Sequence, residues 1–164
     1  RPMLWGYQLW VNLPARLKMS EPGYQDIPPE KIREVDTDDF RVRLIAGEYA
    51  GKTGAAHTHI PVIYFDVIFK REAVFRHGFR SSFNALLVGV SGDAIVAKDR
   101  FAAGDIAVFG GGDAVEVAAH AGSRLLLIAA EPIGEPVARY GPFVMNTKEE
   151  IHQAFADYEA GKLA

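Results

Sequence analysis

The middle of the chain is a succession of short apolar segments separated by glycines, with no helical pattern between them. Seven segments rich in β-branched, aliphatic or aromatic residues are predicted strands, at residues 40–45, 62–69, 84–90, 94–97, 106–109, 114–119 and 125–130. The breaks between them fall at Gly47, Gly51, Gly54, Gly78, Gly92, Gly104, Gly110 to Gly112 and Gly122. Consecutive strands without helices predict an all-β sandwich or barrel, and the double-sheet jelly roll is one such fold.

The segment before these strands has two parts. Residues 7–13 alternate apolar and polar side chains up to Pro14, which predicts a further strand. Residues 14–39 hold four prolines and many charged residues, so they are predicted to be a long connection with little regular structure. Connections of this length tend to link domains or to wrap a partner surface.

One α-helix is predicted at the C-terminal end. Thr147 and Glu150 have the spacing of a capping box, and Gly161 is a suitable stop residue. The apolar stripe of the helix is Ile151, Ala154, Phe155 and Tyr158. We expect this stripe to pack on the barrel of the same chain, with a partner surface as the alternative.

Composition excludes several classes of protein. The 164 residues suffice for one domain with a core, and a net charge of −3 without a basic patch argues against direct nucleic-acid binding. The absence of cysteine fits a reducing, cytoplasmic location. No apolar run approaches the length of a membrane span, and the first residues lack the features of a signal peptide. Because the chain begins with Arg1, we expect a fragment or a processed chain.

Two stretches near the chain ends are distinctive. One is Glu-Pro-Val-Ala-Arg-Tyr-Gly-Pro-Phe-Val-Met-Asn-Thr at 135–147, and the other is Gln-Leu-Trp-Val-Asn-Leu-Pro-Ala at 8–15. Together they resemble the pirin family, whose members consist of two cupin β-barrels in tandem. The resemblance covers nearly the whole chain and corresponds to the C-terminal half of a family member. It implies an inter-barrel strand and connection at 1–39, a cupin-type jelly-roll barrel at 40–146 and a C-terminal helix at 147–164.

Cupins commonly hold a metal through two motifs, G-x5-H-x-H-x3,4-E-x6-G and G-x5-P-x-G-x2-H-x3-N. Laid onto Gly104, Gly110 and Gly112, the second motif places Val115 where the ligand histidine is expected and Ala119 where the asparagine is expected. With Gly92 as its closing glycine, the first motif places its glutamate at Ala85 and its histidine pair at Gly78 and Arg80, or at Phe79 and Ser81. No ligand is kept at these positions, so the resemblance implies a barrel without a metal centre.

A second match to G-x5-H-x-H starts at Gly51 and ends in His57 and His59. No glutamate follows at the required spacing, and the pair precedes a predicted strand instead of following one. Alternate strand residues share a face, so the two imidazoles could chelate a metal, but two ligands make a weak site. A polar loop is the favoured interpretation, and a metal site formed by His57 and His59 is the alternative.

Asp66 and a group of phenylalanines are weaker candidates. Asp66 interrupts an apolar strand, as a catalytic carboxylate or, the favoured reading, as a hydrogen-bonded structural residue. Phe79, Phe83, Phe101 and Phe109 could line a cavity for a small apolar ligand, although core packing is the commoner role of such residues.

The resemblance implies a structural or regulatory role for a metal-free C-terminal barrel. The alternative is a part of a metal-dependent, quercetin 2,3-dioxygenase-like enzyme. Iron or another divalent metal would then sit only in the missing N-terminal half. Trp5, Tyr7 and Trp10 would be covered by that half, and left exposed they would form an apolar patch. We therefore expect the chain to bind the N-terminal half or to dimerise through its N-terminal strand.

Overall fold

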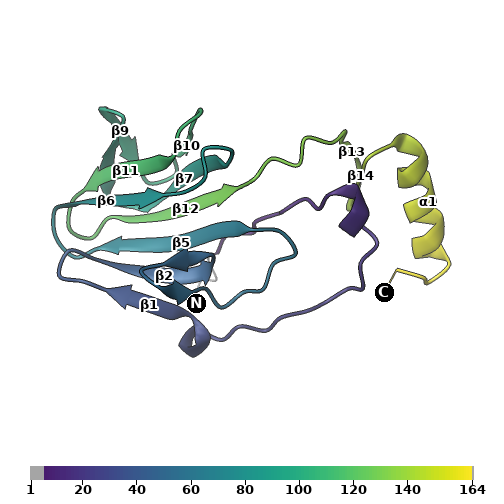
Figure 1. Ribbon diagram of the computed structural model, residues 1–164, viewed down its shortest axis with the longest axis horizontal. Coiled ribbons are helices and arrows are strands. Elements are labelled where there is room, and N and C mark those ends of the chain that lie inside the picture. The colour runs from purple at the N-terminus through teal and green to yellow at the C-terminus, as the bar shows by residue number, and fades with distance from the viewer. Residues whose placement is uncertain (1–5, 164) are drawn as a thin grey trace, which may run out of the picture. The chain divides into compact units, whose positions relative to one another are not determined.

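The computed structural model describes residues 6–163, which form two compact units (Figure 1). The sandwich unit comprises residues 24–132, and the terminal unit combines residues 6–23 with residues 133–163. These boundaries differ from a division at residues 39 and 146. The connection after residue 23 belongs with the strands, and the segment from residue 133 onward belongs with the helix.

The sandwich unit is made of two antiparallel sheets and one small hairpin. The six-stranded sheet has the order β1 (Arg33–Asp36), β2 (Phe40–Ala46), β5 (Val62–Phe69), β12 (Arg124–Ala130), β7 (Asn84–Ser91), β10 (Ile106–Val108). The four-stranded sheet has the order β6 (Ala73–Gly78), β11 (Ala114–Ala119), β8 (Asp93–Val96), β9 (Asp99–Ala102). The hairpin pairs β3 (Glu48–Tyr49) with β4 (Lys52–Thr53), and the 3₁₀ helix η2 (Pro29–Lys31) precedes β1. This arrangement is the predicted all-β, cupin-type jelly-roll sandwich.

The core lies between the two sheets because alternate residues of each strand point to the same face. On β5, Phe65 and Val67 are fully buried, and Phe75 of β6 and Val117 of β11 meet them from the other sheet. Figure 1 shows β5 and β12 side by side in the centre of the larger sheet, where Leu127 is opposite Phe65.

All seven predicted strands are present, with ends that differ by one residue at most. The strands that the sequence analysis did not predict are short or strongly polar, such as β1, β6 and β9. On β6, Phe75 is buried whereas Arg76 is exposed, so the apolar content is too low to mark a strand by itself. The glycines 110–112 lie in the connection between β10 and β11, as expected.

Gly89 allows the two sheets to approach at one point. A Cβ atom at this position would lie 2.1 Å from the carbonyl oxygen of Ala102, which precedes the β9–β10 turn. The backbone of Gly89 also donates a hydrogen bond to Asp105 O (3.0 Å) and accepts one from Gly104 N (2.9 Å). No side chain fits there, so glycine is required by a close backbone approach.

The terminal unit consists of the 3₁₀ helix η1 (Ala15–Leu17), the hairpin β13 (Ala138–Tyr140) and β14 (Phe143–Met145), and the helix α1 (Lys148–Glu159). The strand predicted at residues 7–13 is wrong, because residues 6–14 have no regular secondary structure. Alternation favours an extended chain, but a strand also needs a neighbouring strand to accept and donate backbone hydrogen bonds. Within residues 6–163, no helix has the length and apolarity needed to cross a membrane.

Candidate functional site

The terminal unit brings together the two distinctive stretches of the sequence. The carboxylate of Glu135 accepts hydrogen bonds from Ala15 N (2.7 Å) and from Asn146 Nδ2 (2.9 Å). One side chain thus connects the end of the first stretch to both ends of the second. Asn146 Nδ2 also donates to Pro136 O (3.0 Å), so this amide closes the 135–147 segment on itself.

Lys18 makes a second connection between the chain ends. Its ammonium group donates to Asn12 Oδ1 (2.7 Å) and to the backbone oxygen of Val144 (3.1 Å). A lysine has three donors, and here two are directed at groups 132 residues apart in the sequence. The extended segment that contains Trp10 is therefore held beside the edge of the β13–β14 hairpin.

The helix α1 starts with the predicted capping box. Glu150 N donates to Thr147 Oγ1 (3.1 Å), and the Glu150 carboxylate accepts from Thr147 N (2.9 Å) and from Asn146 N (2.8 Å). The carboxylate also lies in the first turn, where the helix dipole favours negative charge. Gly161 adopts a φ of 69° just after the helix, as a stop residue does.

The helix packs on a hairpin that the sequence analysis did not predict. The Phe143 ring meets that of Phe155 edge to face, with centroids 4.9 Å apart, and Tyr140 lies 5.7 Å from Phe155. Gly141, with a φ of 55°, and Pro142 form the two-residue turn, a combination that suits a type II′ hairpin. Within this unit, the apolar side of α1 therefore packs against β13 and β14.

A groove of about 750 Å³ lies between the N-terminal segment, the hairpin and the helix of this unit. Its wall is mostly apolar and includes Trp10, Val11, Met19, Val137, Phe143 and Met145. The Arg139 guanidinium lies over the Trp10 ring at 5.5 Å from its centroid, which fixes the indole at the rim by a cation–π contact.

The terminal unit exposes many large apolar side chains beside this groove. Trp10 is 56% exposed, Met19 68% and Tyr140 69%. Tyr7 and Val137 are also exposed, whereas Trp5 lies outside the described residues. Large exposed apolar side chains gathered beside a groove are typical of a protein interaction site. We call the exposed side chains of Tyr7, Trp10, Met19, Val137 and Tyr140 the terminal surface; of these, Trp10, Met19 and Val137 line the groove.

His57 and His59 lie in the connection between β4 and β5, and both are exposed. Residues 54–61 are not a strand, so the strand geometry that would place both imidazoles on one face does not apply. Gln25 holds this connection by donating to His57 O (2.7 Å) and accepting from His57 N (2.8 Å). Both hydrogen bonds between Gln25 and His57 thus use the backbone of His57 and not its imidazole.

Three of the positions that the cupin metal motifs assign to ligands point into the sandwich, whereas Arg80 and Ser81, two of the positions assigned to the histidine pair, are exposed. Val115, Ala119 and Ala85 are all at most 4% exposed and belong to the core. Apolar side chains therefore occupy these positions in this chain. Among the described residues, no three histidine, aspartate or glutamate side chains are placed to hold a metal ion together.

His77 is a half-buried imidazole at one end of the core. It points inward from β6, and its ring centroid lies 5.0 Å from that of Phe65, 5.6 Å from Tyr49 and 6.4 Å from Phe79. Burial among these rings lowers the pKa of His77 and raises the pKa of the Tyr49 phenol, because each charged form loses hydration. The phenylalanines 79, 83, 101 and 109 belong to the core or pack against it.

Asp66 has the structural role that the sequence analysis favoured. It is 2% exposed on β5, and its carboxylate accepts two hydrogen bonds of 2.7 Å from Arg124 Nε and Nη2 on β12. Arg43 on β2 donates a third, at 3.1 Å. Two arginines thus balance the buried carboxylate and tie three neighbouring strands together.

The sequence model of the pirin C-terminal cupin domain matches residues 64–164, more than half of the chain. The chain belongs to the pirin family. It is 43% identical to a pirin-like protein of Caulobacter vibrioides over 96% of this chain and 58% of that protein. It is also 38% identical to human pirin over 96% of this chain and 56% of that protein. The chain thus spans a little more than half the length of these relatives.

Solved structures give the same placement within the family. A crystal structure of a quercetin 2,3-dioxygenase from Acinetobacter baumannii superimposes with a TM-score of 0.86 at 33% identity. The match covers 94% of this pirin-family chain and 55% of the dioxygenase chain. The sandwich unit is therefore a cupin domain of the pirin type.

Proposed function

We propose that this chain is the metal-free C-terminal cupin barrel of a pirin-like protein and has a structural or regulatory role. The observation that carries this proposal is the terminal surface. Its apolar side chains lie at and near a groove in a unit that has almost no core of its own, because Ile151 and Ala154 are its only buried apolar side chains among the described residues. A unit of this composition gains stability when a partner covers it.

The partner that we propose is the N-terminal cupin half. About two fifths of the length of these relatives lies outside the match, and the family model that matches is that of a C-terminal domain. In this proposal the extended residues 7–13 supply the missing strand when a sheet of the other half pairs with them. The apolar side chains at Ala85, Val115 and Ala119 support a barrel that works without a metal of its own. A cytoplasmic location is part of the same proposal.

Co-expression tests the partner directly. The segment of the Caulobacter relative that this chain does not match would carry the affinity tag, and the untagged chain should co-purify with it at equal stoichiometry. Replacing Trp10 and Tyr140 by alanine should reduce recovery by at least ~10-fold, because buried aromatic anchors dominate such interfaces. The matched control replaces Val74 and Ile95, two exposed apolar residues of the sandwich, which should change nothing. Equal recovery of all variants, or none of the wild type, would contradict the proposal.

A second candidate function follows from the similarity to a structure named quercetin 2,3-dioxygenase. The chain would then be part of a metal-dependent enzyme whose metal lies in the N-terminal half. Elemental analysis of the purified chain distinguishes a metal site in this chain from one in the N-terminal half. We expect no stoichiometric metal in the purified chain. Stoichiometric metal that is lost in His57→Ala/His59→Ala would assign a metal site to this chain and overturn the metal-free proposal.

A further inference from the structure

The outer face of the six-stranded sheet carries a second apolar surface, in the sandwich unit. Side chains that point inward from β7, β10 and β12 belong to the core or pack against it, as Leu87, Ala107 and Leu127 do. The alternate side chains of the same strands point outward and are also apolar. An ordinary half-solvated sheet has polar residues on its outer face, so this pattern calls for an explanation.

The strand register places the outward side chains in two adjacent rows. Ile128 of β12 is opposite Leu86 of β7, which is opposite Val108 of β10. In the next row, Leu126 is opposite Val88, which is opposite Ile106. These six residues form one continuous area across three strands, which we call the sheet patch.

The edge of the sheet patch is the most accessible part of it. Ile106 is 63% exposed and Val108 is 77% exposed. Leu86, Val88 and Ile128 are half-buried, and Leu126 at the centre is 5% exposed. Two highly exposed β-branched residues on an edge strand are a liability for a protein that keeps this face free.

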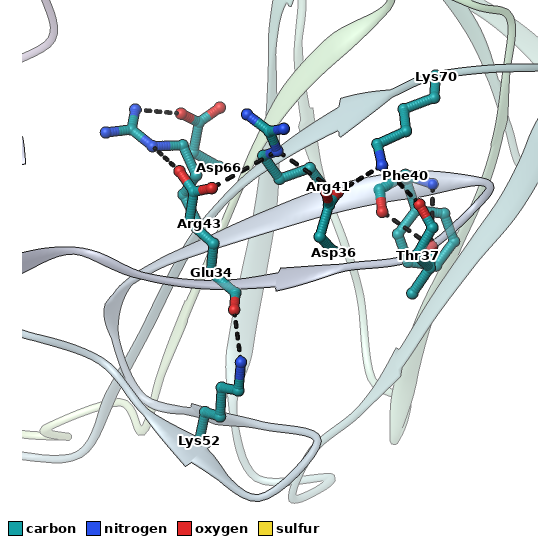
Figure 2. Close-up of polar contacts among 9 residues, drawn as sticks. All are labelled: Glu34, Asp36, Thr37, Phe40, Arg41, Arg43, Lys52, Asp66 and Lys70. Atoms are coloured by element: carbon teal, nitrogen blue, oxygen red, sulfur yellow. Dashed lines mark hydrogen bonds and ion pairs between the residues drawn. The ribbon is translucent and has the colours of Figure 1, made fainter. Parts of the chain in front are cut away.

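A charged network borders the sheet patch on the β1, β2 and β5 side, and Figure 2 shows its side chains pointing toward one another. Arg43 contacts Glu34 at 3.3 Å and Asp66 at 3.1 Å. Arg41 lies 3.5 Å from Glu34 and 3.4 Å from Asp36. Each of these carboxylates therefore has a cationic neighbour on the same face, and the border carries both signs of charge.

We propose that the sheet patch and its charged border are the contact face between two copies of this chain. An apolar centre with a polar, charged border is the usual anatomy of an interface. A border of mixed sign does not repel a second copy of itself, which a two-fold contact requires, because the same surface meets on both sides. The strands of this sheet are three to eight residues long. At about 3.3 Å per residue and about 4.8 Å between strands they give a face of roughly 600 Å², which is the lower end of the ~600–1,000 Å² per partner of a standard interface.

This proposal concerns the sandwich unit and does not depend on the terminal surface. The test is the mass in solution of the whole chain, measured by sedimentation velocity over a concentration series. The wild type should sediment as a dimer at micromolar concentration. Ile106→Asp/Val108→Lys should weaken dimerisation by about 100-fold or more, because it replaces the two most exposed apolar side chains of the contact with charges that must be desolvated. The matched control, Val74→Lys/Ile95→Asp, alters two exposed apolar residues of the four-stranded sheet and should remain dimeric.

Three outcomes would overturn the proposal. A monomeric wild type shows that the face has no second copy on it. A dimer that survives Ile106→Asp/Val108→Lys but not Trp10→Ala/Tyr140→Ala places the contact on the terminal surface instead. A dimer lost equally in the control variant shows a nonspecific effect of surface charge. Circular dichroism of each variant verifies that the sandwich is folded, so loss of the dimer is not confused with unfolding. Failure here leaves the co-purification test of the N-terminal partner unaffected.

Discussion

The sandwich unit and the terminal unit differ in how much apolar surface each one buries by itself. In the sandwich, Phe65, Phe75 and Leu127 are completely buried between two sheets. In the terminal unit, Phe143 and Phe155 are only half-buried, and Tyr140 is 69% exposed. Since burial of apolar surface is the main favourable term in folding, the first unit has a core sufficient for independent stability and the second does not.

The polar contacts of the two units differ in the same direction. Asp66 in the sandwich is a buried carboxylate held by two arginines across three strands. Glu135 and Lys18 in the terminal unit are more accessible and join segments that are otherwise held by few apolar contacts. Hydrogen bonds of this kind position a segment more than they stabilise it, because water competes for the same groups. The polar contacts of the terminal unit thus fix the positions of its segments and add little to its stability.

Truncation of one phenylalanine in each unit should give the largest contrast. Phe75→Ala leaves a cavity between the sheets and should lower the free energy of unfolding by about 3–5 kcal/mol. Phe143→Ala should leave the urea unfolding transition of the sandwich within about 0.5 kcal/mol of wild type, because surface changes away from a core have small effects. Equal losses for the two variants would show that the units form one cooperative core.

Removal of the Asp66 charge should be the next largest effect. Asp66→Asn leaves Arg43 and Arg124 without their buried carboxylate. Breaking a fully buried ion pair lowers the free energy of unfolding by about 3–5 kcal/mol. We expect a loss of about 2 kcal/mol here, because both arginines are partly solvated. Asp93→Asn is the control, since its pair with Arg100 is exposed and is worth at most about 0.5 kcal/mol. Urea titration of both variants measures the difference, and similar values would mean that the Asp66 network is a surface feature.

Loss of the helix cap should affect only the terminal unit. Thr147→Ala removes the acceptor for Glu150 N and should destabilise α1 by about 1 kcal/mol. Exchange of the Glu150 and Ile151 amides, which donate to Thr147, should become about 5-fold faster, whereas amides of β5 and β12 should keep their rates. Thr147→Ser retains the hydroxyl and should restore slow exchange. Faster exchange in the sandwich strands as well would contradict the separation of the units.

The smallest predicted effect is a dependence on pH that comes from His77. Burial lowers the pKa of His77 below the value of 6.5 that it has in the unfolded chain, so the unfolded chain binds the proton more tightly. The stability from the neutral imidazole is present above pH 6.5 and is lost as the pH falls through the pKa of the folded protein. The free energy of unfolding should therefore decline below pH 6.5, and less so in His77→Gln. Parallel pH profiles for the two proteins would show that His77 is not the group responsible.

The sandwich was largely predictable because its strands carry their own signal. Most of the apolar side chains between residues 40 and 130 are buried or half-buried, and the glycines between the segments limit the length of each strand. The capping box at Thr147 and Glu150 was equally predictable, since a helix N-terminus is determined by residues close in sequence. Strands such as β6 and β9 were not predicted, because they are strands through their pairing with β11 and β8 and not through an apolar composition.

The candidate site was predictable only in part. The two distinctive stretches were visible, but their connection through Glu135 and Ala15 joins residues 120 positions apart, and no local pattern reports such a contact. The same limit explains the error at residues 7–13. Alternation there is real, yet whether it becomes a strand depends on a neighbour that a single segment does not reveal. His57 and His59 show the opposite case, a spacing that fits a metal motif on an exposed connection.

Hydrogen–deuterium exchange of the purified chain tests the difference between the two units most directly. We predict that backbone amides of β2, β5, β7 and β12 are protected for hours, whereas those of β13, β14 and α1 exchange at least ~100-fold faster, because local stability follows buried apolar contact. Addition of the N-terminal segment of the Caulobacter relative should slow exchange in the terminal unit alone. Equal protection of the two units in the isolated chain would contradict the account, since the terminal unit would then be stable without a partner.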